Sequence, residues 1–250
     1  MKNNRKHLED YARYLKLRNF ANATCKTYVS GLRHFLEFRD QNDIRGPLSQ
    51  DQAIQFLNFT HDQGKSWSLF NCIYSALRKY FREVLDIEWS VKKLPRPRKD
   101  RILPEIISEQ EVVQLIEHAT IYKHQVLITL LYATGLRLSE VLHLRIEHIH
   151  GDRKQIFVHK GKGHKDRYVH IPECLLQLLR NYFLRYRPEV YLFNGIEKGK
   201  SLSPSAAQWA IRSARHRAGL LKKTTTHTLR HCYATHHLEA GTNLIFIQHD

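Results

Sequence analysis

The chain has 250 residues, 42% of them hydrophobic, which suits one large domain or two modest ones and argues against disorder. Lys and Arg number 40 against 24 Asp and Glu, and the resulting formal charge of +16 favours a polyanionic partner, nucleic acid first. The sequence shows no apolar run near twenty residues, no lipidation signal and no apolar stretch after its basic start. A membrane partner and a secretory signal are therefore not expected.

Residues 1–90 are predicted to form a compact helical domain. Apolar residues recur at helical spacing within Leu8–Leu15 and Tyr28–Leu36, which indicates two helices. A capping box, Ser49-x-x-Gln52, opens a third helix, and a fourth runs from about residue 66 to residue 85. Basic residues are expected on the solvent side of these helices: Arg33, Lys65, Arg78, Lys79 and Arg82.

Residues 91–104 are predicted to be a linker. The run Lys92–Arg101 reads KKLPRPRKDR, and proline lacks an amide donor and disfavours a helix before it. An extended, positively charged connection between two basic domains is the expected result. A solvated segment and a contact with a phosphate backbone are equally compatible with this sequence.

Residues 105–250 are predicted to form a second, α-rich domain with a small β-hairpin. A capping box at Ser108-x-x-Glu111 opens it, and an apolar helix stops at Gly135, where a glycine is the usual left-handed cap. A helix that carries Arg137 is expected to begin at once. The remaining predicted elements are strands at 155–158 and 167–171 around a glycine-rich turn, and helices at 173–186, at 204–218 behind the cap Ser203, and from the cap Thr226 to Gly241.

Two short segments carry the residue types of an anion site. Residues 133–140 read ATGLRLSE and residues 226–231 read THTLRH, and each is expected to present an arginine, Arg137 or Arg230, from the first turn of a helix. A guanidinium group binds a phosphate by two parallel hydrogen bonds. His227 shares a helix face with Arg230, opposite the face of Leu229 and Tyr233, and the N-terminus of a helix favours an anion.

Each residue also has a purely structural explanation. Arg137 can pair with Glu140 three residues on, Arg230 can pair with another carboxylate, and Lys162 sits in a turn where a solvated lysine is common. A histidine-rich helix (His227, His231, Cys232, His236 and His237) raises a metallohydrolase as a less favoured reading. Arg230 lies between the first two histidines and would repel a cation, so no metal is expected.

In this order the segments resemble the tyrosine recombinase (phage integrase) family, and most closely its Xer-type and transposon-borne members. The resemblance covers nearly the whole chain and rests on ATGLRLSE, the GKGHKDR turn (161–167) and HTLRHCYATHHLEAGTNL (227–244). It implies a mainly α fold: an N-terminal four-helix SAM-like core-binding domain (1–90), a linker (91–104) and an α-rich catalytic domain (105–250) with a small antiparallel sheet. The four cysteines form no CxxC, which indicates reduced thiols in a cytoplasmic protein. The implied DNA substrate makes a nucleoid-associated location the expectation.

The resemblance also implies a role for each site residue. Arg137 and Arg230 would clamp the scissile phosphate, Glu140 would support Arg137, Lys162 would protonate the departing 5′ oxygen, and His227 would handle a proton or contact the phosphate. In the family a tyrosine hydroxyl attacks the phosphodiester and forms a 3′-phosphotyrosyl link, without a metal or other cofactor. The implied activity is site-specific DNA recombination or integration on double-stranded DNA, together with other recombinase protomers.

One part of the family pattern is not found. The Leu-Gly-His motif and the nucleophilic tyrosine would follow residues 247–248, but no tyrosine follows Tyr233, which is expected in the core. Residues 1–250 are thus expected to hold no nucleophile, through truncation of the chain, and to bind DNA without cleaving it. Two alternatives are a non-catalytic DNA-binding remnant and a tyrosine supplied by another subunit.

Overall fold

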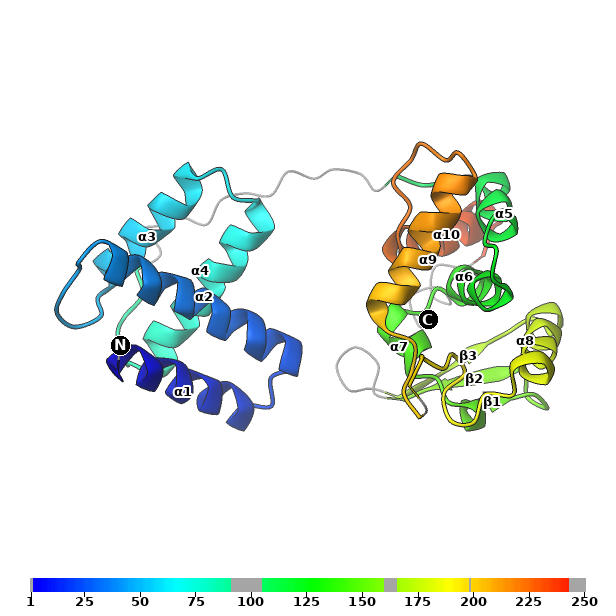
Figure 1. Cartoon of the computed structure of the whole chain (residues 1–250), viewed down its shortest axis with the longest axis horizontal. Coiled ribbons are helices and arrows are strands. Elements are labelled where there is room, and N and C mark those ends of the chain that lie inside the picture. Colours follow the sequence, from blue (N-terminus) through cyan, green and yellow to red (C-terminus); the bar gives the residue numbers. More distant parts are fainter. Residues whose placement is uncertain (1, 91–104, 160–165, 198, 243–250) are drawn as a thin grey trace. The chain divides into compact units, whose positions relative to one another are not determined.

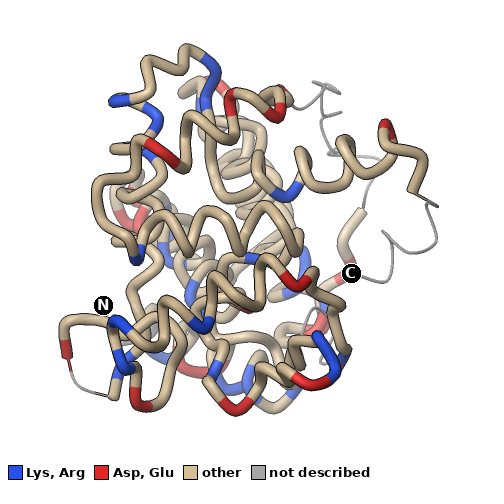
Figure 2. Tube along the Cα trace, turned by 90° about the vertical axis from the view of Figure 1, so that its right-hand side faces the viewer, with Lys and Arg blue, Asp and Glu red and all other residues tan. Residues whose placement is uncertain are grey.

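The computed structural model divides the chain into two compact units, Met1–Arg101 and Ile102–Asp250 (Figure 1). It describes residues 2–90, 105–159, 166–197 and 199–242. The predicted linker, 91–104, therefore lies outside the described residues. Each unit has an apolar core of its own, and Lys and Arg recur along the helices among fewer Asp and Glu (Figure 2).

The first unit is a four-helix arrangement. Its helices are α1 (Lys2–Leu17), α2 (Asn22–Gln41), α3 (Gln50–Asp62) and α4 (Trp67–Glu83). The predicted capping box is present, since the Ser49 side chain accepts a hydrogen bond from the Gln52 amide and the Gln52 side chain accepts one from the Ser49 amide. These local signals begin and end the helices, and the apolar faces then pack together.

Aromatic side chains fill the core of this unit. Phe35 of α2 is fully buried, and its ring lies 5.7 Å from that of Phe56 and 5.9 Å from that of Phe81. Helices α2 and α4 pack closely because Gly31 has no side chain; a Cβ there would lie 3.1 Å from the Cβ of Ala76. The core therefore joins α2, α3 and α4.

The second unit is built around a central helix, α6, that packs against four others. Its elements are α5 (Glu109–Glu117), α6 (Tyr122–Thr134), α7 (Leu138–Leu142), a 3-10 turn η1 (Ile146–His148), β1 (Ile149–His150), β2 (Gln155–Val158), β3 (Arg167–His170), α8 (Glu173–Tyr186), α9 (Pro204–Arg217) and α10 (Thr226–Glu239). Helix α6 packs against α5, α8, α9 and α10. Six of its thirteen residues are buried, five of them aliphatic and the sixth a threonine: Val126, Leu127, Ile128, Leu130, Leu131 and Thr134.

A three-stranded antiparallel sheet in the order β1-β2-β3 covers one part of this core. Ile156 of β2 pairs with Val169 of β3 and with Ile149 of β1. The mainly α fold with a small antiparallel sheet confirms the fold class expected from the sequence. Strand β1 was not predicted, because two residues are too few to show an alternating pattern.

Two predicted boundaries need correction. Thr225, not Thr226, caps α10, because its side chain accepts the hydrogen bond from the Thr228 amide. Arg137 lies at the N-cap of α7 rather than within its first turn. Gly135 does end α6 as predicted, in a left-handed conformation with φ of 60°.

The described helices include none with the length and apolar character needed to cross a lipid bilayer. All four cysteines are free thiols, and Cys25 and Cys232 are buried.

Candidate functional site

Arg137 is held by the short helix that follows it. Its backbone amide donates to Glu140 Oε2 over 2.9 Å, and its Nη1 donates to Glu140 Oε1 over 3.0 Å. Only 6% of the Glu140 side chain is exposed, against 33% for Arg137. The carboxylate is therefore a fixed internal partner, and the guanidinium keeps an edge toward solvent. The pairing of Arg137 with Glu140 was foreseen, but as a surface pair.

A third residue, Arg167, completes this network. From β3 its Nη1 and Nη2 donate to the two carboxylate oxygens of Glu140, each over 3.0 Å. Burial raises the pKa of Glu140, but hydrogen bonds from Arg167 and Arg137 outweigh burial, so its pKa lies below the ordinary value. Glu140 thus stays charged and orients two arginines.

Sequence reasoning assigned no role to Arg167, although the strand pattern holds a signal. Arg167 and Val169 are two residues apart and share a face of β3, and Val169 is buried. A cation on the inner face of a strand needs a partner, and Glu140 is that partner.

Arg230 reaches the same turn from α10. Its Nη1 donates to the backbone carbonyl of Gly135, between α6 and Arg137. Burial lowers the pKa of Arg230, and the positive charge of Arg137 lowers it further. The two arginines predicted from separate motifs are thus close enough for mutual repulsion. An anion bound between them would relieve that repulsion.

Tyr233 packs on this turn. A Cβ atom at Gly135 would lie 2.4 Å from Cδ1 of the Tyr233 ring, and that ring contacts His237 at 4.5 Å between centroids. Position 135 therefore favours glycine for two reasons: the backbone is left-handed there, and the Tyr233 ring leaves no room for a side chain.

An open pocket of about 530 Å³ joins Arg137 to His227. Its walls come from α7, α9 and the start of α10, and they include Ser139, Arg212 and Thr226. His227 is exposed one turn before Arg230. Of the residues predicted for the site, Arg137 and His227 line this pocket. Glu140 binds Arg137, and Arg230 binds the carbonyl of Gly135, two residues before Arg137. Lys162 lies outside the described residues. Arg212 was missed, and an exposed arginine on a helix carries no signal of its own.

The histidines of α10 have different surroundings. His236 is buried, and its Nδ1 forms a hydrogen bond of 2.9 Å with the Tyr132 hydroxyl, while His231 is exposed. Among the residues that the structure describes, no three His, Cys, Asp or Glu side chains are grouped as ligands for a metal ion.

Comparisons with known proteins match both units. Residues 105–249 match the model of the phage integrase family, and residues 8–91 match that of the phage integrase N-terminal SAM-like domain. The chain is similar to tyrosine recombinase XerA of Pyrococcus furiosus, with 34% identity over 247 residues, covering 96% of this chain and 83% of the relative. It is 30% identical to tyrosine recombinase XerD of Oceanobacillus iheyensis, covering 96% and 87%.

Solved structures share the fold. A crystal structure of XerA recombinase matches 98% of this chain and 88% of its own, with a TM-score of 0.55 and 27% identity. A lambda integrase dimer bound to a COC′ core site matches 98% and 93%, with a TM-score of 0.75 and 18% identity.

Proposed function

We propose that this chain, which belongs to the phage integrase family of tyrosine recombinases, binds double-stranded DNA and holds one backbone phosphate between Arg137 and Arg230. The observation that carries the proposal is that Arg230 binds the carbonyl of Gly135, two residues before Arg137, although the two arginines are separated by ninety-odd residues of sequence. The partly open pocket beside Arg137 and His227 provides room for a phosphodiester.

The charges of the site suit a reaction in which negative charge grows on a phosphate. Glu140 is satisfied by two arginines, so it does not cancel the positive charge of Arg230. The guanidinium groups of Arg137 and Arg230 would bind the non-bridging oxygens and stabilise the transition state. Because the donors are already oriented, little reorganisation is required when the phosphate binds.

The proposed strand-cleavage step follows the family mechanism. The tyrosine hydroxyl gives up its proton to His227 or to water, and its oxygen forms a bond to phosphorus as the bond to the 5′ oxygen breaks. Lys162 delivers a proton to the departing 5′ oxygen. His227 contacts the phosphate or carries a proton. The reverse step, with a second strand as nucleophile, rejoins the backbone. Arginines supply the positive charge, so the proposal includes no metal or cofactor.

The proposal extends to organisation and partners. Residues 1–90 would form the core-binding domain, 91–104 the linker and 105–250 the catalytic domain. Lambda integrase has been solved as a dimer on a core site and as a tetramer on a Holliday junction, and we infer a similar assembly of protomers on DNA for this chain. A cytoplasmic, nucleoid-associated location follows from such a substrate.

The first test measures the affinity for a labelled duplex over a range of salt concentrations. Binding should weaken steeply with salt because phosphate contacts release counterions. A flat response would contradict the proposed DNA binding.

The second test asks whether Arg230 acts in the chemical step. Cleavage of a nicked suicide substrate is measured in a polypeptide that also carries the tyrosine segment of the family. Arg230→Ala should slow covalent trapping by about 100-fold or more, the usual effect of losing one transition-state donor. Duplex affinity should change far less. If affinity collapsed while the trapping rate of bound complexes stayed normal, Arg230 would serve only in binding.

A further inference from the structure

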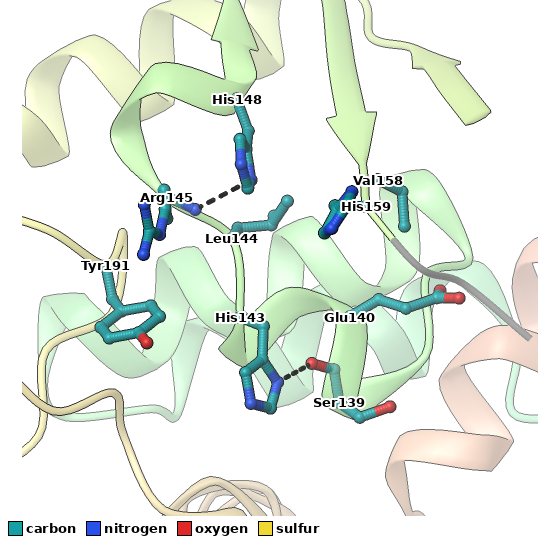
Figure 3. A pocket seen from close by; sticks show the side chains of 9 residues that line it. All are labelled: Ser139, Glu140, His143, Leu144, Arg145, His148, Val158, His159 and Tyr191. Carbon is teal, nitrogen blue, oxygen red and sulfur yellow. Dashed lines mark hydrogen bonds between the residues drawn. The ribbon is translucent and has the colours of Figure 1, made fainter. Parts of the chain in front are cut away.

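A second pocket lies beside the first and shares Ser139 with it. It has a volume of about 620 Å³, and its walls are α7, η1, the end of β2 and the segment around Tyr191 (Figure 3). Its side chains include His143, Arg145, His148 and His159. No role was assigned to these residues from the sequence.

Backbone contacts hold the walls of this pocket in place. Arg145 and Tyr191 face each other in an antiparallel bridge, and the Leu192 amide donates to the Leu144 carbonyl over 2.8 Å. The Nδ1 atom of His143 lies 2.6 Å from the Ser139 carbonyl, to which it donates. These contacts tie α7, the segment before η1 and the segment around Tyr191 to one another.

The ring of His148 offers a donor to the pocket without carrying a charge. The Arg145 amide donates to His148 Nδ1 over 3.3 Å (Figure 3), so in the neutral ring the proton lies on Nε2. Burial lowers the pKa of His148, Arg145 and His159 lower it further, and Glu147 opposes them. A neutral Nε2–H group can donate to an anionic oxygen.

The carboxylates around this pocket are either already paired in the interior or exposed to solvent. Glu140, the carboxylate in its wall, is already paired with Arg137 and Arg167. Glu147 pairs with Arg145 and Asp166 pairs with His159, but these two carboxylates are 67% and 47% exposed. Exposed pairs contribute little free energy, so a more highly charged phosphate backbone can displace them.

We propose that this pocket binds a second phosphate of the same DNA strand, through the Arg145 guanidinium and the His148 ring. The inference rests on the proposed function, because the first phosphate lies at Arg137. Phosphates of one strand repeat about every 3.4 Å along the duplex axis, so pockets that share a residue can be bridged by one backbone. The contact fixes the position of the strand and reads no base.

The test compares the salt dependence of duplex binding in matched variants. Arg145→Ala removes the proposed contact and Arg145→Lys keeps the charge. Arg180→Ala is the control, because Arg180 is also half exposed and also pairs with one surface carboxylate, Glu173. Labelled duplexes of two unrelated sequences are titrated by fluorescence anisotropy, and circular dichroism verifies folding. His148→Gln gives a second, independent variant.

Arg145→Ala should reduce the slope of log affinity against log salt by about one and weaken both duplexes equally. Arg145→Lys should keep the slope, His148→Gln should weaken binding, and Arg180→Ala should match the unmodified chain. Equal behaviour of Arg145→Ala and Arg180→Ala would overturn the second phosphate site while DNA binding stood. A loss that depended on sequence would also overturn it, in favour of base contact. If the unmodified chain showed no salt-dependent binding, that result would instead contradict the proposed function itself.

Discussion

The two units use buried and half-buried arginines in different ways. In the first unit, Arg39 is 8% exposed and its Nη2 donates to the Gly46 carbonyl over 2.7 Å, which ties a loop to α2. In the second unit, Arg137 and Arg167 share the carboxylate of Glu140. Burial lowers the pKa of Arg230, and the positive charges of these two arginines lower it further. A single inward arginine that binds one carbonyl is structural, whereas several convergent arginines leave positive charge for a ligand.

The stability of the two units is expected to depend on different interactions. The first unit relies on aromatic packing, and its ion pairs, such as Arg5–Glu9, are exposed. The second unit has an aliphatic core around α6, with a charged network at its edge. Substitutions that remove one kind of interaction should therefore separate the units.

The largest effect is expected from Phe35→Ala. This side chain is fully buried between two other rings, and such a truncation costs about 3–5 kcal/mol of unfolding free energy. Phe59, which is 45% exposed, is the matched control, and Phe59→Ala should cost far less. Denaturant unfolding combined with hydrogen exchange in α2 and α4 measures both. Equal losses in the two variants would show that the aromatic core does not dominate this unit.

The next largest effect is expected from Glu140→Gln. The substitution keeps the shape but leaves two arginines without their buried counter-charge, which should cost about 3 kcal/mol, the low end for a buried pair because both arginines still reach water. Denaturant midpoints provide the measurement. Glu147→Gln removes an exposed partner of Arg145 and should leave the midpoint unchanged. If Glu140→Gln also left the midpoint unchanged, the pairs of Glu140 with Arg137 and Arg167 would not stabilise the second unit.

The loss of unfolding free energy in Glu140→Gln should depend on pH. The pKa of Glu140 is lowered in the folded chain from its ordinary value of 4.5. Its stabilisation is therefore present above that value and is lost as the pH falls through the folded pKa. The difference between the unmodified chain and Glu140→Gln should shrink below about pH 4.5. A difference that stayed constant into acid would contradict the assignment.

A smaller effect is expected from Gly135→Ala. The φ of 60° is strained for alanine, and the added Cβ would overlap the Tyr233 ring, so we expect a loss of about 2 kcal/mol. Gly219 has a φ of 65° with open space around it, and Gly219→Ala should cost only the strain, about 1 kcal/mol. Thermal unfolding of both variants compares them. Equal losses of stability in the two variants would mean that the Tyr233 ring can move away from the added Cβ atom at no cost in free energy.

Much of the architecture followed from local sequence. The Ser49 and Ser108 capping boxes, the glycine after α6 and the apolar spacing within α2 and α4 each depend on residues only a few positions apart. Hydrogen bonds over such short separations form in nearly any fold that keeps the helix. The motifs around Arg137 and Arg230 were recognisable for the same reason, since each is a short segment.

The geometry of the site depended on the tertiary structure. Arg167 is 27 residues from Glu140, and Arg230 is 95 residues from Gly135. Packing of α10 on α6 and of β3 beside α7 decides whether such residues meet, and no local pattern encodes it. The sequence alone established the helices, the motifs and the excess of positive charge. Only the packed core decided that one buried carboxylate orients two arginines and that a third arginine, Arg230, binds the carbonyl of Gly135 beside Arg137.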